Sequence, residues 1–405
     1  MSEHFVIVGG GQAAAQAAQT LRQEAPDARI TLFGEEPEAP YQRPPLSKKY
    51  LAGALPRERL LLRPRSFYDE RSIALELGCR VVAIDRGAHR LHLGDGRTVP
   101  YDRLLLATGS RARRLSVPGA ELPGTHYLRT VADVDRIRAA LDGARRVVLI
   151  GAGYIGLEAA AVLVERGLDV TVLEAAERPL ARVVCAEVAR FYHDYHARHG
   201  VKLSYGAAVV ELLGTRQVEA VATADGARHD CDLAIVGIGI EPNVELASDA
   251  GLECDNGIVV DRCARTADEA VFAAGDCANQ PDLEGTRRVR LESVPNAVHQ
   301  SKIAALGMLG RPTPYAEVPW FWSDQYDLKL QIAGLSAGYD AVVLRGAPET
   351  KSFAAYYLAR GRVIAVDAVN SPRDFLAAKK LIAAAVPVSA EAIADPTTDL
   401  AALAR

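Results

Sequence analysis

Apolar and polar positions along residues 147–174 follow the pattern of a strand, a helix and a second strand. Residues 147–150 are all apolar, which is typical of a strand buried on both faces of a parallel sheet. A glycine-rich turn comes next, then a helical pattern to about Arg166, and then a second apolar run at 170–173. The pattern therefore predicts a complete βαβ unit.

The turn between the first strand and the helix has the spacing Gly151-x-Gly153-x-x-Gly156. The first glycine allows a tight turn, the second lets a pyrophosphate approach the backbone, and the third lets helix and strand pack closely. The helix N-terminus supplies N–H groups and a positive dipole to the phosphates. We expect a dinucleotide to contact these glycines and the intervening Tyr154 and Ile155.

Two acids belong to the same stretch. Glu174 ends the second strand, where a carboxylate accepts hydrogen bonds from a ribose and repels a 2′-phosphate, so it favours NADH over NADPH. Arg178 and Arg182 leave this preference open, since either could accommodate the phosphate. Glu158 stands just after the last glycine, and the sequence alone permits an ordinary solvated carboxylate there.

Residues 5–35 repeat the same theme. An apolar strand at 5–8 precedes Gly9-Gly10-Gly11, an alanine-rich helix to about Glu24, and a strand at 29–33 that leads to Glu35. The third glycine of the fingerprint is replaced by Ala14, which the motif permits. Two copies of one fingerprint are stronger evidence than either alone, so we expect the chain to bind two dinucleotides.

The remaining segments are less regular. Four prolines make residues 37–53 a stiffened loop, which composition alone would allow to be a plain solvated surface. Helical pattern is expected within 55–78, a hairpin across 80–93, and a buried strand at 102–110. Further elements are predicted as strands near 201–203, 207–212, 218–222, 231–243, 256–261 and 270–279, helices at 186–199 and 293–309, and an antiparallel sheet with a helix after residue 312.

Composition removes several classes of function. The 405 residues are 49% hydrophobic and 24% charged, as in an ordinary globular protein of several domains. A net charge of −4 argues against nucleic-acid or anionic-membrane binding, and the absence of an apolar run or a signal sequence predicts a cytoplasmic protein. The six cysteines form no CxxC pair and no zinc spacing, so we expect free thiols and no metal site.

Nine segments spread over almost the whole chain resemble one family. They are VGGGQAAA (8–15), RPPLSK (43–48), LATGS (106–110), YLRT (127–130), GAGYIGLEAAA (151–161), GIGIEPN (237–243), AAGDCA (273–278), ESVPNA (292–297) and PWFWSDQY (319–326). The chain is similar to the putidaredoxin reductase-like family, FAD-dependent NADH reductases of two-iron, two-sulfur ferredoxins that serve bacterial oxygenases. PPLSK, ESVPNA and WFWSDQ are the narrower motifs.

The resemblance implies a role for particular residues. FAD would be contacted by Gly9, Gly11, Ala13, Ala14, Glu35, Arg43, Lys48, Val81, Arg129, Asp276 and Val294. The nicotinamide nucleotide would be contacted by Gly151, Gly153, Tyr154, Ile155, Gly156, Glu158, Glu174, Arg182 and Gly239. Lys48, Glu158 and Trp320 would act at the reacting centre, with Trp322 also beside the flavin and Glu158 within reach of Lys48.

The resemblance also implies the architecture. It is α/β, with two Rossmann-like domains of the glutathione-reductase type, one inserted in the other, and a C-terminal α+β domain. The FAD domain would comprise residues 1–112 and 242–318, the NAD domain 113–241, and the last domain 319–405. Glutathione- and thioredoxin-type reductases need paired thiols beside the flavin, but the loop from Tyr41 to Pro45 holds no sulfur, so a dithiol mechanism is not expected.

The expected function is electron transfer from NADH through FAD to a two-iron, two-sulfur ferredoxin, and indirectly to a haem-thiolate or Rieske oxygenase. An alternative is an NADH-binding flavoprotein with a signalling or interaction role, since apoptosis-inducing factor shares the lysine of PPLSK and the glutamate of the second fingerprint. The acidic balance of the chain counts against a DNA-binding role of that kind.

Overall fold

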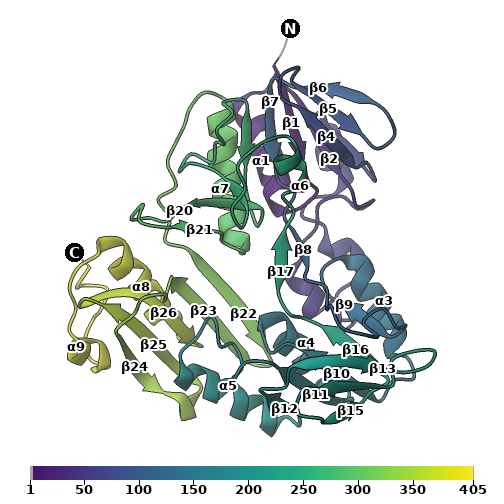
Figure 1. Ribbon diagram of the computed structural model, residues 1–405. Coiled ribbons are helices and arrows are strands. Elements are labelled where there is room, and N and C mark those ends of the chain that lie inside the picture. Colours follow the sequence, from purple (N-terminus) through teal and green to yellow (C-terminus); the bar gives the residue numbers. More distant parts are fainter. Residues whose placement is uncertain (1–2, 405) are drawn as a thin grey trace. The chain divides into compact units, whose positions relative to one another are not determined.

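The computed structural model describes residues 3–404, which separate into two compact units (Figure 1). The first unit comprises residues to 42, 57–111 and 241–319, and the second comprises 43–56, 112–240 and those from 320 on. The chain crosses between the units after residues 42, 56 and 319, and also within β8 (Ser110–Ala112) and β17 (Ile240–Pro242). Each unit is built around its own parallel five-stranded sheet.

The sheet of the first unit has the strand order β19-β7-β1-β2-β3, and all its pairings are parallel. Its strands are β1 (His4–Val8), β2 (Arg29–Gly34), β3 (Ile73–Leu77), β7 (Arg103–Leu106) and β19 (Val271–Ala273). Every residue of β1 is buried, as its apolar sequence predicts for a strand covered on both faces.

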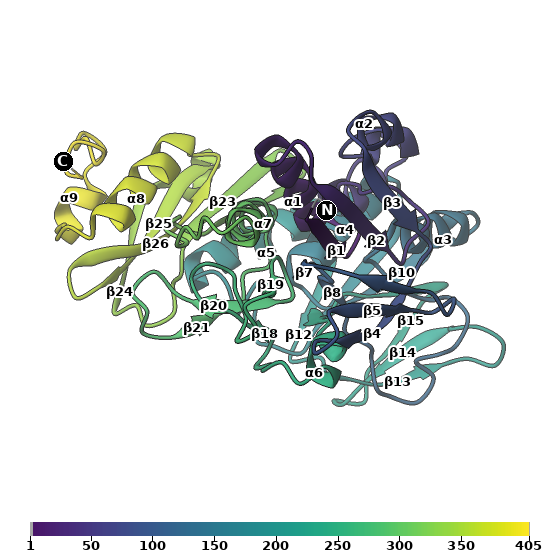
Figure 2. The same ribbon diagram turned by 90° about the horizontal axis from the view of Figure 1, so that it is seen from above.

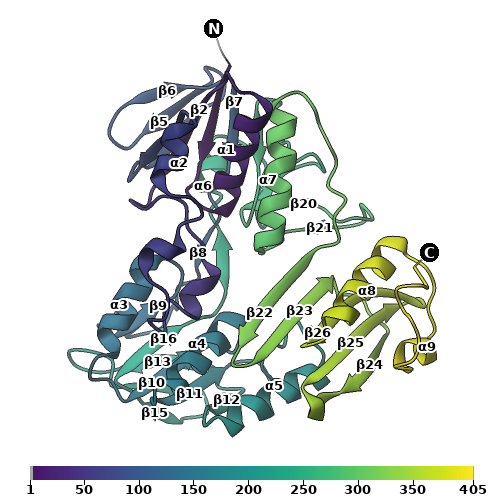
Figure 3. The same cartoon turned by 180° about the vertical axis from the view of Figure 1, so that it is seen from behind.

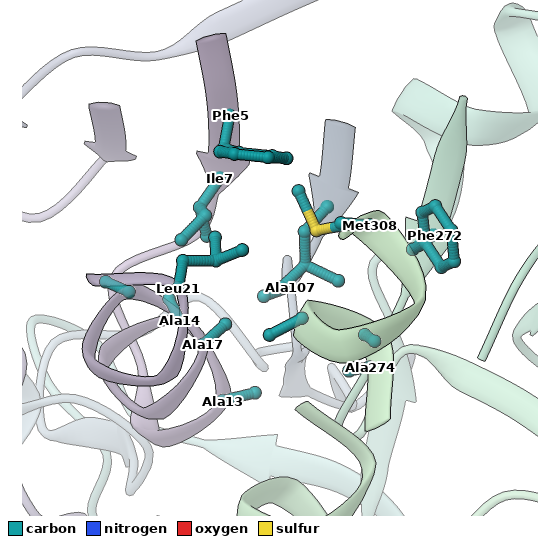
Figure 4. Close-up of a cluster of buried hydrophobic side chains, with 14 of the residues drawn as sticks. Phe5, Ile7, Ala13, Ala14, Ala17, Leu21, Ala107, Phe272, Ala274 and Met308 are labelled. Atoms are coloured by element: carbon teal, nitrogen blue, oxygen red, sulfur yellow. The ribbon is translucent and has the colours of Figure 1, made fainter. Parts of the chain in front are cut away.

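Helices α1 (Gln12–Glu24) and α7 (Val294–Met308) lie side by side in this unit (Figures 1 and 2). Figure 4 shows Phe5 and Ile7 of β1 directed toward Leu21 of α1 and Met308 of α7. The buried alanines of α1, such as Ala17, let the helix approach its neighbours closely. Alternation along β1 sends one set of side chains into this cluster.

The other set faces a second cluster in the same unit. Val6 and Val8 of β1 pack with Leu91 and Leu93 of a three-stranded antiparallel sheet. That sheet contains β4 (Val81–Asp85), β5 (Arg90–Leu93) and β6 (Thr98–Pro100). The unit also contains α2 (Arg65–Glu70), α6 (Glu245–Asp249), the 3-10 helix η2 (Arg57–Leu60) and the short strands β18 (Ile258–Val259), β20 (Ala278–Pro281) and β21 (Arg288–Val289).

The second unit repeats this plan in its central part. Its parallel sheet has the order β12-β11-β10-β16-β9. The strands are β9 (Thr125–Tyr127), β10 (Arg146–Ile150), β11 (Asp169–Glu174), β12 (Lys202–Tyr205) and β16 (Leu233–Val236). The helices are α3 (Val131–Leu141), α4 (Tyr154–Glu165), α5 (Ala186–Arg198) and the 3-10 helix η1 (Pro44–Ser47).

A three-stranded antiparallel sheet again covers part of the parallel one. Val148 and Ile150 of β10 cluster with Leu212 and Val221 of this smaller sheet. Its strands are β13 (Val209–Leu213), β14 (Ala220–Thr223) and β15 (Arg228–Asp230). The two units therefore share one way of burying a parallel sheet.

The C-terminal part of the second unit is an antiparallel sheet of order β22-β23-β26-β25-β24, with α8 packed on β26 and β23 (Figure 3). Its elements are β22 (Trp320–Gln325), β23 (Leu328–Gly334), β24 (Ala341–Ala347), β25 (Ser352–Ala359), β26 (Arg362–Val369), α8 (Pro372–Ala384), α9 (Ala390–Ala394) and the 3-10 helix η3 (Pro348–Thr350). The hairpin expected from its turn joins β25 to β26, with Arg360 in the left-handed region at φ 52°.

The predicted fold class is confirmed by these three sheets. The helical pattern expected within 55–78 corresponds to η2 and α2, whereas β3, which pairs with β2 at the sheet edge, was not predicted. β3 is partly exposed and lacks the apolar run of a central strand. The strand expected at 256–261 is reduced to β18, and β9 and α3 were not predicted. Among residues 3–404 no helix is long and apolar enough to cross a membrane.

Candidate functional site

The first glycine-rich turn forms an open cradle at the N-terminus of α1. Gly9 has φ 131°, and a Cβ there would lie 2.0 Å from the Ala107 carbonyl oxygen, so only glycine fits. Gly11 is the N-cap, has no side-chain capping bond, and a Cβ on it would meet nothing within 4 Å. Because the first turn carries no acid, its N–H groups are free of side-chain competition and suit a pyrophosphate.

The second turn repeats this geometry at α4. Gly151 has φ 106°, and its Cβ would lie 2.4 Å from the Gly237 carbonyl oxygen. Gly153 is the N-cap, again without a side-chain capping bond or an acid in the first turn. A Cβ on Gly156 would lie 2.1 Å from the Gly151 carbonyl oxygen, so the helix begins against its own turn. Both turns fit a dinucleotide phosphate.

The acids that end the two second strands differ in their surroundings. One carboxylate oxygen of Glu174 accepts from the N–H of Ala152 at 2.7 Å, and the other accepts from that of Ala176 at 2.8 Å. Its carboxylate therefore ties its own loop to the glycine turn. Glu35 has a side chain 71% exposed and lies 3.7 Å from the Arg80 guanidinium.

Other candidate FAD residues of the first unit lie on or next to its buried elements. The Ser110 hydroxyl donates to Asp276 Oδ2 at 2.8 Å, and Arg290 donates to the Asp276 backbone carbonyl at 3.1 Å. Val294 is the first residue of α7, and Val81 is buried in β4. The Asp276 carboxylate is thus held in a fixed position after β19.

In the second unit, two further pairs of candidates come together. Arg43 donates to the backbone carbonyl of Arg129 at 2.9 Å. A Cβ on Gly239 would lie 3.8 Å from Arg182 Nη2, which places this guanidinium at the end of β16. The exposed side chain of Ile155 and the ring of Tyr154 follow the second glycine turn, and that ring packs on Phe321 with centroids 4.7 Å apart.

Glu158 is a buried carboxylate that accepts hydrogen bonds from three side chains. Its side chain is 2% exposed, and Lys48 Nζ lies 2.6 Å from Oε2. The Ser47 hydroxyl also donates to Oε2, at 2.5 Å, and the Ser323 hydroxyl donates to Oε1 at 2.6 Å. Lys48 Nζ makes another bond, 3.1 Å long, to the Pro44 carbonyl. Because every donor is close, the buried charge is compensated rather than isolated.

The strand β22 presents different side chains on its two faces. Ser323 and Phe321 face α4, because one bonds Glu158 and the other packs on Tyr154. Trp320 and Trp322 lie on the opposite face, with ring centroids 5.6 Å apart. The Trp320 ring also packs on Phe375 of α8, and Lys379 Nζ lies 5.6 Å from its centroid.

All six cysteines are free. Burial raises the pKa of each thiol, to about 11 for Cys185 and Cys231. A thiol with a raised pKa holds little thiolate at neutral pH and is a poor nucleophile. The raised pKa therefore disfavours the reactive thiolate at all six cysteines.

Residues 3–301 match the family described as pyridine nucleotide-disulphide oxidoreductase, and residues 320–404 match the description reductase C-terminal. The chain belongs to the pyridine nucleotide-disulphide oxidoreductase family. Membership confirms the prediction of an oxidoreductase with FAD and a pyridine nucleotide as cofactors.

Several members of this family resemble the chain over its full length. Rhodocoxin reductase of Rhodococcus erythropolis is 46% identical over 98% of this chain and 93% of its own length. The solved ferredoxin reductase for the CYP199A2 system of Rhodopseudomonas palustris is 41% identical, with a TM-score of 0.97 and all of both chains covered. The covalent putidaredoxin reductase–putidaredoxin complex gives 41% identity and a TM-score of 0.94, covering 98% of this chain and 97% of that one. The resemblance inferred from the nine motifs is confirmed.

Sequence reasoning anticipated the contact of Lys48 with Glu158 but missed its other partners. Ser47 and Ser323 lie inside the motifs RPPLSK and PWFWSDQY, yet no role was assigned to either hydroxyl. Alternation along 320–325 was an available signal, because it puts Ser323 on the face opposite both tryptophans. The roles assigned to the individual site residues stay predictions.

Proposed function

We propose that this family member passes electrons from NADH through FAD to a two-iron, two-sulfur ferredoxin, which in turn supplies a haem-thiolate or Rieske oxygenase. The single observation that carries the proposal is its full-length likeness to a reductase whose structure was solved in covalent complex with putidaredoxin. The free cysteines with raised pKa support it, since they offer no internal disulfide as an electron acceptor.

FAD, when bound, supplies the chemistry that couples a two-electron hydride donor to one-electron acceptors. The protein contributes binding and orientation. The cradles at Gly9–Gly11 and Gly151–Gly153 would hold the two pyrophosphates, with FAD at the first and NADH at the second. The ion pair of Lys48 and Glu158 would hold a fixed charge distribution beside the nicotinamide and the flavin, where it needs no reorganisation during the reaction.

NADH is proposed over NADPH because of Glu174. A 2′-phosphate at the ribose would meet a carboxylate that two backbone N–H groups hold in place. Arg182 lies at Gly239, and Arg178 donates to the carbonyls of Val184 and Ala181, so Arg178 is engaged within its own loop. These contacts favour discrimination against the phosphate.

The assignment of the domains along the chain is part of the same proposal. An FAD domain at 1–112 and 242–318, an NAD domain at 113–241 and a C-terminal domain at 319–405 would each supply part of the site. Trp320 and Trp322 of the last segment would lie beside the flavin.

The test is an anaerobic titration of the FAD-loaded protein, first with NADH and then with NADPH, followed by mixing with candidate ferredoxins and with disulfides. The proposal expects rapid bleaching of the flavin by NADH, much slower bleaching by NADPH, and onward transfer to a ferredoxin but not to a disulfide. Rapid flavin reduction without transfer to any ferredoxin would contradict it, and equal rates with NADPH would contradict the NADH assignment.

A further inference from the structure

A chain of hydrogen bonds in the second unit runs from Glu158 into the protein interior. Ser323 Oγ lies 2.6 Å from Glu158 Oε1, and Gln325 Nε2 lies 3.1 Å from Ser323 Oγ. Gln325 Oε1 lies 2.8 Å from His196 Nε2, and His196 Nδ1 lies 3.3 Å from the Tyr326 hydroxyl. Ser323 and His196 are 0% exposed and Gln325 is 1% exposed, so water does not compete for these bonds.

The direction of every bond follows from the charge at one end. Glu158 faces Lys48 and, as an anion, can only accept, so Ser323 must donate its proton to Oε1. Ser323 Oγ then accepts from the amide nitrogen of Gln325, which leaves the amide oxygen facing the histidine.

The tautomer of the histidine follows in turn. His196 must donate from Nε2 to the amide oxygen of Gln325, so its Nδ1 carries no proton and accepts from Tyr326. Burial lowers the pKa of His196 to about 4, which keeps the ring neutral at physiological pH. Every hydrogen bond in this series therefore has its donor on the side away from Glu158 and its acceptor on the side toward it.

We propose that His196, Gln325 and Ser323 are positioning residues that fix Glu158 for the hydride-transfer step of the proposed function. An amide neither gives up nor takes on a proton at neutral pH, so the chain carries orientation and polarisation rather than protons. Each bond that donates toward the anion strengthens the next, and the last one holds Oε1 while Ser47 and Lys48 hold Oε2.

The bond directions make a prediction for Glu158→Gln that the tautomer of His196 can test. Lys48 can only donate, so the amide oxygen of the new side chain turns to Lys48 and its nitrogen faces Ser323. Ser323 then accepts from that nitrogen and donates to Gln325, whose amide must turn over. His196 Nε2 becomes an acceptor, and the proton moves to Nδ1.

The experiment is ¹⁵N NMR of histidine-labelled, FAD-loaded protein, which separates protonated from unprotonated ring nitrogens and needs neither NADH nor a ferredoxin. The chain has nine histidines, and the signals of His196 are assigned by their loss in His196→Gln. We expect the Nε2–H tautomer in the wild type and the Nδ1–H tautomer in Glu158→Gln. His193 lies on the same helix but takes no part in this series of hydrogen bonds. It bonds Tyr205, so its signals should not change. One tautomer shared by the wild type and Glu158→Gln, or Nδ1–H in the wild type, would overturn the proposal.

Kinetics supply the functional half of the test. Gln325→Leu removes the donor to Ser323 and should slow the limiting rate of flavin reduction about tenfold, with the NADH concentration for half-saturation unchanged. His196→Gln keeps a donor at the Nε2 position and should stay within about twofold of the wild type, whereas His196→Leu should match Gln325→Leu. If Gln325→Leu, His196→Gln and His196→Leu all reduce their flavin at the wild-type rate, the positioning role is overturned. If the tautomer switches but no ferredoxin is reduced, the proposed electron acceptor fails and the positioning chain stands.

Discussion

The two glycine-rich turns offer a comparison within one molecule. Gly9 and Gly151 both have a positive φ, and each lies against a backbone carbonyl just after the end of a neighbouring strand. Both helices have a glycine as N-cap, with no side-chain capping bond. The helices differ at the same position counted from the first glycine, which is Gln16 in one and Glu158 in the other. Gln16 is partly buried, and among residues 3–404 its side chain bonds Thr20, one turn further along the helix, at 3.2 Å.

Glu158 instead receives donors from the Pro-rich loop and from the C-terminal sheet. The comparison teaches that the phosphate cradle is generic, whereas the next turn of the helix distinguishes the two sites. One helix presents a neutral amide that needs no distant partner. The other presents a buried charge that is stable only if two segments from elsewhere in the chain supply donors.

The largest expected effect comes from removing the Glu158 carboxylate, which distinguishes α4 from α1. Glu158→Ala leaves Lys48 without its anion and should slow flavin reduction by NADH roughly 100-fold while FAD stays bound, because a preorganised charge is lost. Stopped-flow absorbance measures the rate, and the flavin-to-protein ratio measures retention.

Gln16→Ala is the matched control in the first unit. It should change the reduction rate and the FAD content by no more than about twofold, since only a local bond is lost. If Glu158→Ala reduces its flavin as fast as Gln16→Ala does, the carboxylate has no part in the reaction.

The second prediction concerns the third position of the fingerprint. Gly156→Ala puts a Cβ 2.1 Å from the Gly151 carbonyl oxygen, so the start of α4 must shift and NADH affinity should fall about 30-fold or more. Ala14→Gly at the equivalent place in α1 removes a methyl group and should cost only about 1 kcal/mol of stability. Titration of the half-saturating NADH concentration checks the first, and thermal unfolding checks the second. Equal NADH affinity in Gly156→Ala and the wild type would show that the helix start tolerates displacement.

A third prediction uses the other buried carboxylate of the second unit. Asp367 on β26 accepts from Tyr357 through Oδ2, while Oδ1 has no hydrogen-bond partner among residues 3–404. Burial raises its pKa from 3.8 to about 7. Between these values the folded protein keeps a proton that the unfolded chain has lost, so this group lowers stability as pH rises through that window.

Asp367→Asn removes the titration, and the variant should gain stability over the wild type as the pH rises from 5 to 8, by about 2–3 kcal/mol over that range. The difference in thermal midpoint between the two proteins, measured across that range, checks the sign. A difference that does not vary with pH would mean that Asp367 is ionised throughout.

The smallest expected effects separate the two strand-end acids. Glu174→Ala frees two backbone N–H groups of the nucleotide loop and should weaken NADH binding about tenfold while narrowing the gap to NADPH. Glu35→Ala removes an exposed carboxylate and should change FAD affinity by about twofold at most. Apoprotein titration with FAD and steady-state kinetics with both nucleotides measure these changes. If Glu35→Ala loses FAD, the expected contact of Glu35 with the ribose contributes strongly to FAD binding.

The fold was largely predictable because both fingerprints are local. Strand, glycine turn, helix and strand-end acid follow one another within a few dozen residues, and their periodicities are strong in 147–174. β3 was missed because it is a partly exposed edge strand, stabilised by pairing with β2 rather than by its own pattern. β9 has only three residues and depends on pairing with β16.

The site was predictable only in part, for a related reason. Lys48 and Glu158 stand in motifs that a family resemblance can assign, but the donors that complete the pair come from Ser323 and, through it, Gln325 and His196. Nothing in a linear sequence reports that a serine on one strand meets a helix remote in the chain. Such contacts follow from the packing of β22 on α4, which only the three-dimensional structure provides.

One consequence of the shared carboxylate concerns protein engineering. Exchanging the C-terminal sheet with that of a relative would also exchange the Ser323 hydroxyl that donates to Glu158 and the Gln325 amide that donates to Ser323. A chimera should therefore carry Ser323 and Gln325 across unchanged, even if every other residue of the graft is replaced. The C-terminal sheet cannot be exchanged independently of the rest of the second unit, because its first strand, β22, packs on α4.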